Sequence, residues 1–134
     1  MPAEATFPLR SAALGWHTPG IAIDEGAEHL GLIHEGAVVA VVSHTRWPCP
    51  DEPDVPARYF WAMAVTVSHR RRGLGRRLLV ELASRARANG EHLLWADARD
   101  SAVGFYAACG AEVRGGAYVD EVTGLTDRRV VLVL

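Results

Sequence analysis

The sequence has no lysine, only two cysteines, and no apolar run near the roughly 20 residues of a membrane-spanning helix. Cys49 and Cys109 are too few for a disulfide framework and lack metal-ligand spacing. None of the six histidines pairs with another histidine or a cysteine at such a spacing, so we expect no metal. The N-terminus has no basic start and no apolar stretch of a secretory signal, so we expect a cytoplasmic protein with no membrane partner.

The chain does contain enough apolar material for one core. It has 134 residues, 49% of them hydrophobic, and we expect a single domain over residues 1–134.

Charge is distributed unevenly, although the net charge is only −2. Residues 1–57 hold eight acids and two arginines, whereas residues 58–134 hold twelve arginines and eight acids. Guanidinium groups match phosphate oxygens in bidentate pairs, so the basic part suits a polyphosphate ligand. The acidic part could attract a cationic amine.

The most informative stretch is residues 65–79. A β-branched run is followed by Arg70-Arg71-Arg72, by Gly73 and Gly75, and then by a helix with apolar periodicity. Glycines let the main chain approach an anion, and the N–H groups and dipole of a helix start favour negative charge there. Five arginines, counting Arg76 and Arg77, would be unfavourable at a helix start without an anion. The stretch therefore predicts a phosphate-binding turn, and it matches neither the Walker loop nor the Rossmann fingerprint.

The remaining elements follow from periodicity and turn residues. Pro8 indicates an edge strand over residues 5–11, and residues 12–28 show no helical period. Four prolines and three acids over residues 46–56 predict a mobile loop. The other expected elements are a hairpin of strands 29–34 and 37–42, a strand 58–67, a helix 73–89, a strand 92–98, a short helix 100–108, and closing strands 112–121 and 128–134.

A second informative stretch is residues 99–111, where Ala102, Phe105, Tyr106 and Gly110 match the pattern N-x-x-A-x-x-F-Y-x-x-x-G-F. Together with Arg70-x-x-Gly73-x-Gly75, it resembles the GCN5-related N-acetyltransferase (GNAT) family over roughly residues 29–134. The resemblance implies an α+β fold with a twisted, mixed, mostly antiparallel sheet of about six to seven strands flanked by helices. It implies direct acetyl transfer from acetyl-CoA to an amine.

The resemblance also implies site residues. The strand before the turn would bind pantetheine through its backbone, the turn would take the pyrophosphate, and Tyr106 would be the general acid toward the departing thiolate. The cofactor-binding residues are then Met63, Ala64, Val65, Val67, Arg70, Arg71, Arg72, Gly73, Leu74, Gly75, Arg76, Arg99, Phe105 and Tyr106. Without the resemblance, Tyr106 would be taken as an ordinary half-buried aromatic, and Phe105 is expected mainly in the core.

The sequence departs from the family pattern in three places. Arg99 replaces the family's Asn, so it could reach a phosphate or point into water, and Ala111 replaces a Phe. The region between the first expected strand and the hairpin is too short and too rich in Gly and Pro for the usual pair of helices. The acceptor site could therefore be open or be completed by a partner chain.

The general base is not identified by the sequence. Arg58, Tyr59 and Phe60 occupy the strand positions where relatives often carry a Glu, and none of them can act as a base at neutral pH. His44, Glu52, Asp97, Glu121 and ordered water stay open as alternatives.

Two rival functions stay open beside the enzyme. The first is a non-catalytic acetyl-CoA sensor on the same fold, slightly favoured by the missing strand carboxylate. The second is nucleic-acid binding through the arginines, which the acidic net charge opposes, so we expect no nucleic-acid partner. The acceptor, a small molecule or a protein amine, is not identified, and a homodimer through the apolar stretch 130–134 is possible.

Overall fold

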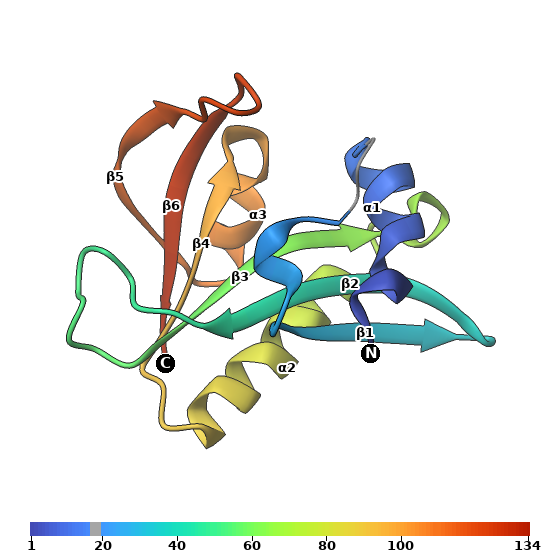
Figure 1. The fold of residues 1–134 in the computed structure, drawn as a ribbon, viewed down its shortest axis with the longest axis horizontal. Helices are drawn as coiled ribbons and strands as arrows, with labels where there is room; N and C mark the ends of the chain where they lie inside the picture. The colour runs from blue at the N-terminus through green and yellow to red at the C-terminus, as the bar shows by residue number, and fades with distance from the viewer. Residues whose placement is uncertain (17–19) are drawn as a thin grey trace. The chain divides into compact units, whose positions relative to one another are not determined.

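The structure is a computed structural model that describes residues 1–16 and 20–134 (Figure 1). Its three α-helices are α1 (Phe7–Leu14), α2 (Leu74–Ala88) and α3 (Val103–Ala108). Its six strands are β1 (Glu28–His34), β2 (Ala37–Arg46), β3 (Ala57–Val65), β4 (Leu93–Arg99), β5 (Glu112–Val119) and β6 (Thr126–Val133). Short 3-10 helices are η1 (Ala3–Thr6), η2 (Ala22–Asp24), η3 (Val67–His69) and η4 (Asp100–Ala102).

The six strands form one mixed sheet in the order β1-β2-β3-β4-β6-β5. β1 and β2 are antiparallel, as are β4 with β6 and β6 with β5, whereas β3 and β4 pair in parallel over Ala57–Tyr59 and Leu93–Trp95. The parallel pair needs a long crossover, and α2 supplies it. The expected mixed, mostly antiparallel sheet with flanking helices is confirmed, with six strands.

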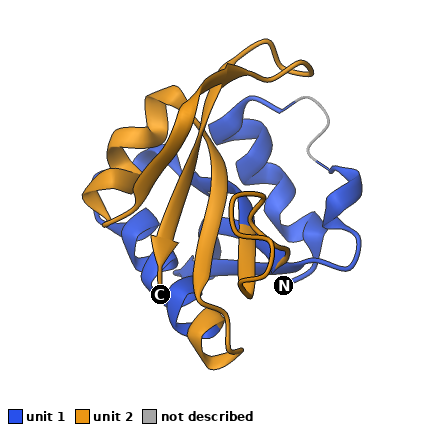
Figure 2. Cartoon of the chain, turned by 90° about the vertical axis from the view of Figure 1, so that its left-hand side faces the viewer, with its two compact units in different colours: residues 1–45, 60–85 blue, residues 46–59, 86–134 orange. Residues whose placement is uncertain are grey.

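Contacts along the chain divide it into two compact units, coloured in Figure 2. Unit 1 is Met1–Thr45 with Phe60–Arg85, and unit 2 is Arg46–Tyr59 with Ala86–Leu134. The expectation of a single domain over residues 1–134 stays a prediction.

In unit 1, β2 is buried on both faces. Val41 packs with Leu9 of α1 and Ala64 of β3, and its neighbours Ala40 and Val42 are also fully buried although they point the other way. Figure 1 shows α1 and α2 on opposite sides of these strands. The buried stripe of α2, at Leu78, Leu79, Leu82, Ala83 and Ala86, has the spacing that the sequence predicted.

The N-terminal expectation is wrong. Residues 3–14 form η1 and α1, whereas the sequence suggested a strand over residues 5–11 and no helix from residue 12. Pro8 lies in the first turn of α1, where a missing N–H costs nothing because that group would have no helical partner. Part of the second expectation falls on residues 17–19, which lie outside the described residues.

The proline-rich segment of unit 2, expected to be a mobile loop, makes specific contacts with the rest of its unit. Cys49 is fully buried in a cluster with Ala57, Leu93, Trp95 and Val131. At the same segment, Glu52 pairs with Arg114, and Asp51 lies 2.9 Å from Nη1 of Arg129. The segment therefore makes two ion pairs and buries a thiol, contacts that its composition did not suggest. Its mobility stays a prediction.

The remaining expected elements agree with the structure within a few residues at their ends. β6 pairs with β4 on one edge, and up to Val131 with β5 on the other. The homodimer through residues 130–134 stays a prediction. Within residues 1–16 and 20–134, no helix is long and apolar enough to span a membrane.

Candidate functional site

The turn between β3 and α2 has the backbone that an anion site requires. After η3, Arg71 has a φ of +63° and Gly73 a φ of +74°, and α2 begins at the next residue. Glycine adopts this left-handed region without penalty, which explains the glycine at position 73. A Cβ added to Gly73 would meet nothing within 4 Å, so the space beside this backbone is open.

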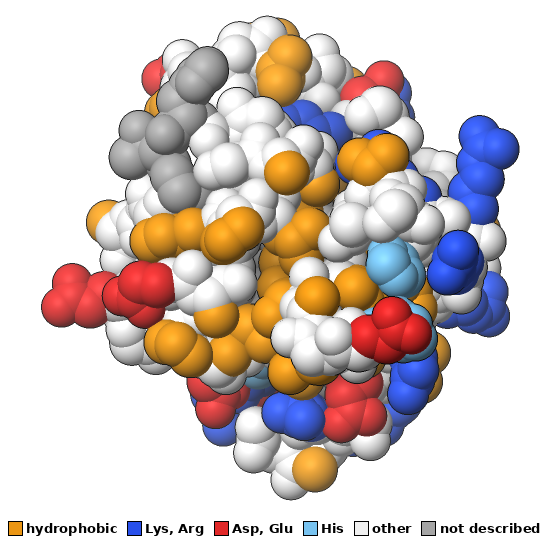
Figure 3. Space-filling view, turned by 90° about the vertical axis from the view of Figure 1, so that its right-hand side faces the viewer, with side chains coloured by type: hydrophobic (Ala, Val, Ile, Leu, Met, Phe, Trp, Pro, Cys, Tyr) orange, Lys and Arg blue, Asp and Glu red, His pale blue; other side chains and the backbone are white. Residues whose placement is uncertain are grey.

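The start of α2 directs N–H groups that have no partner within the helix, together with positive charge, to this turn. The N–H of Arg77 donates to the carbonyl of Gly73 at 3.0 Å, so the N–H groups of the first helical turn precede the first helical bond. Arg70, Arg71 and Arg72 are exposed, and Nε of Arg70 donates to the carbonyl of Val65 at 3.4 Å. Figure 3 shows the right-hand side of Figure 1, where arginine and histidine side chains gather along one edge of the face. The residues present therefore fit a diphosphate group.

The strand that leads into the turn carries one unusual residue. Ala62 has a φ of +52° inside β3, whereas strand residues other than glycine rarely leave the extended region. It precedes the predicted pantetheine-binding segment, of which Ala64 is buried, Met63 and Val65 are half-buried, and Val67 is exposed in η3. The sequence contains no signal for this conformation, because alanine is not a left-handed residue.

Tyr106 lies on α3 in unit 2 and is buried, with 8% of its surface exposed. Burial raises the pKa of its phenol to about 12, and Cys109 adds to the increase. The sequence-based expectation used an ordinary tyrosine, with a pKa near 10. Phe105, expected mainly in the core, is exposed and touches Tyr106 edge to face at 5.1 Å between ring centroids. The burial of the two residues is therefore the reverse of what the sequence suggested.

Arg99 ends β4 and pairs with its neighbour on β6. Its Nη1 donates to Oδ1 of Asp127 at 2.7 Å and to Oγ1 of Thr123 at 3.3 Å. Asp127 is buried, so this pair neutralises a carboxylate inside the sheet. A cofactor contact of Arg99 stays a prediction.

Among the four candidate bases, Asp97 lies in the richest polar surroundings. Tyr118 of β5 donates a hydrogen bond to Asp97, and burial together with this bond raises the pKa of Tyr118. Burial and then the charge of Asp97 raise the pKa of Tyr59 to about 12. Oδ1 of Asp97 is buried without a hydrogen-bond partner among the described residues, 3.6 Å from Nε of Arg129.

The other candidate bases lie elsewhere. His44 is buried on β2, with its Nδ1 3.6 Å from Oε2 of Glu28, and Glu52 is paired with Arg114. Glu121 is exposed in the turn between β5 and β6. In residues 1–16 and 20–134, no group of three or more potential ligands could hold a metal ion.

The family model described as "Acetyltransferase (GNAT) family" matches residues 3–111, which is more than half of the chain. The chain therefore belongs to the GNAT family, and the match reaches further toward the N-terminus than the motifs suggested. A comparison with curated proteins gives no match.

Solved structures share the fold over nearly the whole chain. An IAA acetyltransferase from Bacillus cereus is 16% identical with a TM-score of 0.78, and the alignment covers 100% of this chain and 96% of that one. The ribosomal-protein-alanine N-acetyltransferase from Brucella melitensis is 21% identical with a TM-score of 0.71, covering 99% and 93%. A Salmonella typhimurium protein, solved with its cofactor acetyl-CoA, is 21% identical with a TM-score of 0.71, covering 98% and 86%. At these identities the likeness shows the fold.

Proposed function

We propose that this chain is an N-acetyltransferase that transfers the acetyl group of acetyl-CoA directly to an amine. The observation that carries the proposal is the turn from Arg70 to Arg76, where left-handed backbone, open space and a helix start coincide with a row of arginines. The family membership supports the same reaction. The proposal retains the cytoplasmic location expected from the sequence.

In unit 1, the turn would bind the pyrophosphate through the first N–H groups of α2 and through the side chains of Arg70 to Arg72. The backbone of Met63 to Val67 would hold the pantetheine arm and direct N–H groups at the thioester carbonyl. Such donors stabilise the oxyanion that forms when an amine attacks.

In unit 2, Tyr106 would donate a hydrogen bond to the sulfur of the departing thiolate. Its pKa of about 12 keeps the phenol protonated at neutral pH, so it remains a hydrogen-bond donor there. It is also a weaker acid than an ordinary tyrosine, so complete proton transfer to a thiolate is unfavourable. We therefore propose hydrogen bonding to the leaving sulfur as its main contribution.

The attacking amine must lose a proton, because only a neutral amine is a nucleophile. Of the candidate bases, Asp97 is the one with two tyrosines, Tyr59 and Tyr118, beside its carboxylate. We propose that Asp97 lies on the acceptor side and that water carries the proton away from the amine.

Thermal unfolding in the presence of acetyl-CoA tests the proposal. A ligand at one hundred times its dissociation constant stabilises the folded state by about 2.7 kcal/mol, an increase of several degrees in Tm for a chain of this size. We expect acetyl-CoA and desulfo-CoA to raise the Tm far more than ATP, and we expect an amine screen to identify turnover.

Gly73→Glu and Gly73→Ala form a matched pair for this titration. Both place a Cβ at a φ of +74°, but only the glutamate brings negative charge to the turn. We expect the Ala variant to keep the Tm shift and the Glu variant to lose it. Equal Tm shifts in both variants would mean that the coenzyme does not bind at this turn. Binding of acetyl-CoA without turnover of any amine would favour the sensor function.

A further inference from the structure

Ala62 holds a backbone conformation that its own side chain disfavours. Its φ of +52° brings the Cβ close to the following carbonyl, and such residues persist only where the surrounding structure fixes them. In a strand, one left-handed residue changes the direction in which the next residues point. The next residue here is Met63, where the proposed thioester-binding backbone begins.

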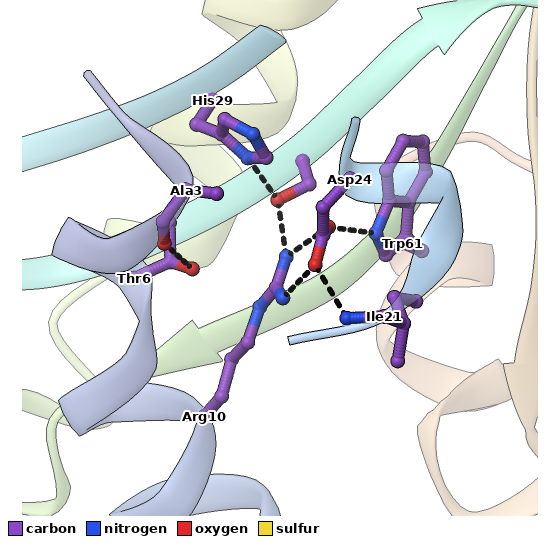
Figure 4. Close-up of polar contacts among 8 residues, drawn as sticks. Ala3, Thr6, Arg10, Ile21, Asp24, His29 and Trp61 are labelled. Atoms are coloured by element: carbon purple, nitrogen blue, oxygen red, sulfur yellow. Dashed lines mark hydrogen bonds and ion pairs between the residues drawn. The ribbon is translucent and has the colours of Figure 1, made fainter. Parts of the chain in front are cut away.

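Trp61, the residue before Ala62, is hydrogen-bonded to a buried carboxylate, as Figure 4 shows. The indole N–H of Trp61 donates to Oδ1 of Asp24 at 3.1 Å. Trp61 is 9% exposed and Asp24 is 8% exposed, so water competes little for this bond. We call this contact the Asp24–Trp61 anchor.

Asp24 also accepts three other hydrogen bonds. Nη1 and Nη2 of Arg10 donate to its two oxygens at 2.6 and 2.8 Å, and the N–H of Ile21 donates to Oδ2 at 2.9 Å. Burial alone would raise the pKa of Asp24, but the hydrogen bonds from Arg10, Ile21 and Trp61 outweigh it and lower that pKa. Asp24 therefore stays an ionised, oriented acceptor at neutral pH.

The support extends to β1 and β2 within unit 1. Nη2 of Arg10 also donates to Oγ of Ser43 at 2.7 Å, and Oγ of Ser43 lies 2.6 Å from Nδ1 of His29. Arg10 is fully buried, with its guanidinium 5.8 Å from the Phe7 ring centroid and 5.3 Å from that of Trp16. Burial of the Arg10 charge in a small unit is costly, and the hydrogen bonds of the network offset that cost. The same network holds the Trp61 side chain of β3.

We infer that Asp24 and Trp61 are positioning residues for acyl transfer, which hold the left-handed backbone at Ala62 so that the N–H groups after it meet the thioester carbonyl. The inference rests on the proposed function. It assigns to η2 and α1 a role in the chemistry of β3, and neither Asp24 nor Trp61 needs to touch a substrate.

Two other roles for Asp24 make different predictions. If the network only stabilises the fold, its loss lowers the Tm and leaves the bound thioester unchanged. Asp24 also lines an open pocket of about 530 Å³ with Glu4, Phe7, Ile21 and His29. If Asp24 binds a ligand there, Asp24→Asn has an effect that Trp61→Phe lacks.

The test is the infrared band of the thioester carbonyl of ¹³C-acetyl-CoA bound to the full chain. Trp61→Phe removes the indole N–H and keeps an aromatic ring, and we expect the band to move to higher wavenumber as the carbonyl loses hydrogen bonding. Asp24→Asn should move it in the same direction and less far. Affinity for CoA, which lacks the carbonyl, should stay within about twofold. The control Trp47→Phe, at an exposed tryptophan, should leave the band in place.

Rescue separates positioning from stability. Ala62→Gly removes the penalty for the left-handed region, so it should return the band of Trp61→Phe toward the wild-type position. A folded Trp61→Phe with an unmoved band would overturn the inference, as would a moved band that Ala62→Gly does not restore. If Trp61→Phe fails to fold, Asp24→Asn with the same rescue decides the matter. A wild-type chain that binds no acetyl-CoA would refute the proposed function as well.

Discussion

At the scale of single residues, buried tyrosines make the stability of this chain depend on pH above pH 10. The pKa of Tyr59 and that of Tyr106 are each raised to about 12, chiefly by burial, and that of Tyr118 is also raised. An unfolded tyrosine loses its proton near pH 10. The stabilisation from each of these tyrosines is therefore complete below pH 10 and is lost as the pH rises through the folded pKa.

We expect the free energy of unfolding of the wild type to fall between pH 10 and pH 12, by up to about 1.4 kcal/mol per pH unit for each of Tyr59 and Tyr106. Tyr106→Phe should make this decline less steep, keep coenzyme binding and lower turnover. Urea unfolding at several pH values, with coenzyme titration and activity, measures all three. An unchanged alkaline slope would mean that Tyr106 is accessible to water, and unchanged turnover would remove Tyr106 from the mechanism.

At the scale of elements, a buried ion pair fixes the start of β3 in unit 2. Nε of Arg58 lies 2.5 Å from Oε1 of Glu91, and its Nη2 donates to Oε2 at 3.0 Å. Glu91 follows α2 and is 2% exposed, and Arg58 is 6% exposed. Arg58 is thus one of the strand positions at which the family resemblance suggested a carboxylate, and it pairs with Glu91 instead.

Glu91→Ala should destabilise the fold by about 3–5 kcal/mol, because it leaves the Arg58 guanidinium buried without its carboxylate. Arg58→Met combined with Glu91→Leu should cost much less, since neither charge remains. Chemical denaturation of both variants measures the difference. If the double variant loses as much stability as Glu91→Ala, the pair contributes through packing and its charges matter little.

At the scale of the whole molecule, a net charge of −2 opposes a polyanionic ligand, and the local field of the turn must outweigh it. Raising the salt concentration from about 20 mM to about 500 mM should therefore weaken CoA binding, by roughly threefold to tenfold. Isothermal titration at several salt concentrations measures the effect.

A matched pair of arginine substitutions tests whether the positive charge that binds CoA lies at the turn. Arg71→Gln, at the turn, should weaken CoA binding and reduce its salt dependence. Arg85→Gln changes the net charge equally, at a side chain paired with Glu81 at 3.0 Å on the same helix, and should alter neither. Equal effects of the two substitutions would mean that binding follows net charge and has no dedicated turn.

The sequence by itself determined the features that depend on near neighbours along the chain. The turn between β3 and α2, the apolar stripe of α2, and the hairpin of β1 and β2 all follow from spacing, helix polarity and glycine. Pro8 was ambiguous because it is tolerated both at a sheet edge and in a first helical turn, and only the packing of Leu9 against Val41 and Ala64 selects the helix.

Only the tertiary structure decided what depends on distant partners. Ala62 is left-handed although nothing in its neighbours encodes it, and Asp24 reaches Trp61 across 37 positions. The raised pKa of Tyr106 and the pairing of Arg99 with Asp127 depend in the same way on which side chains the fold brings together. Burial and long-range hydrogen bonds act through space, so local periodicity predicts the turn between β3 and α2, whereas the backbone geometry of β3 depends on the folded chain.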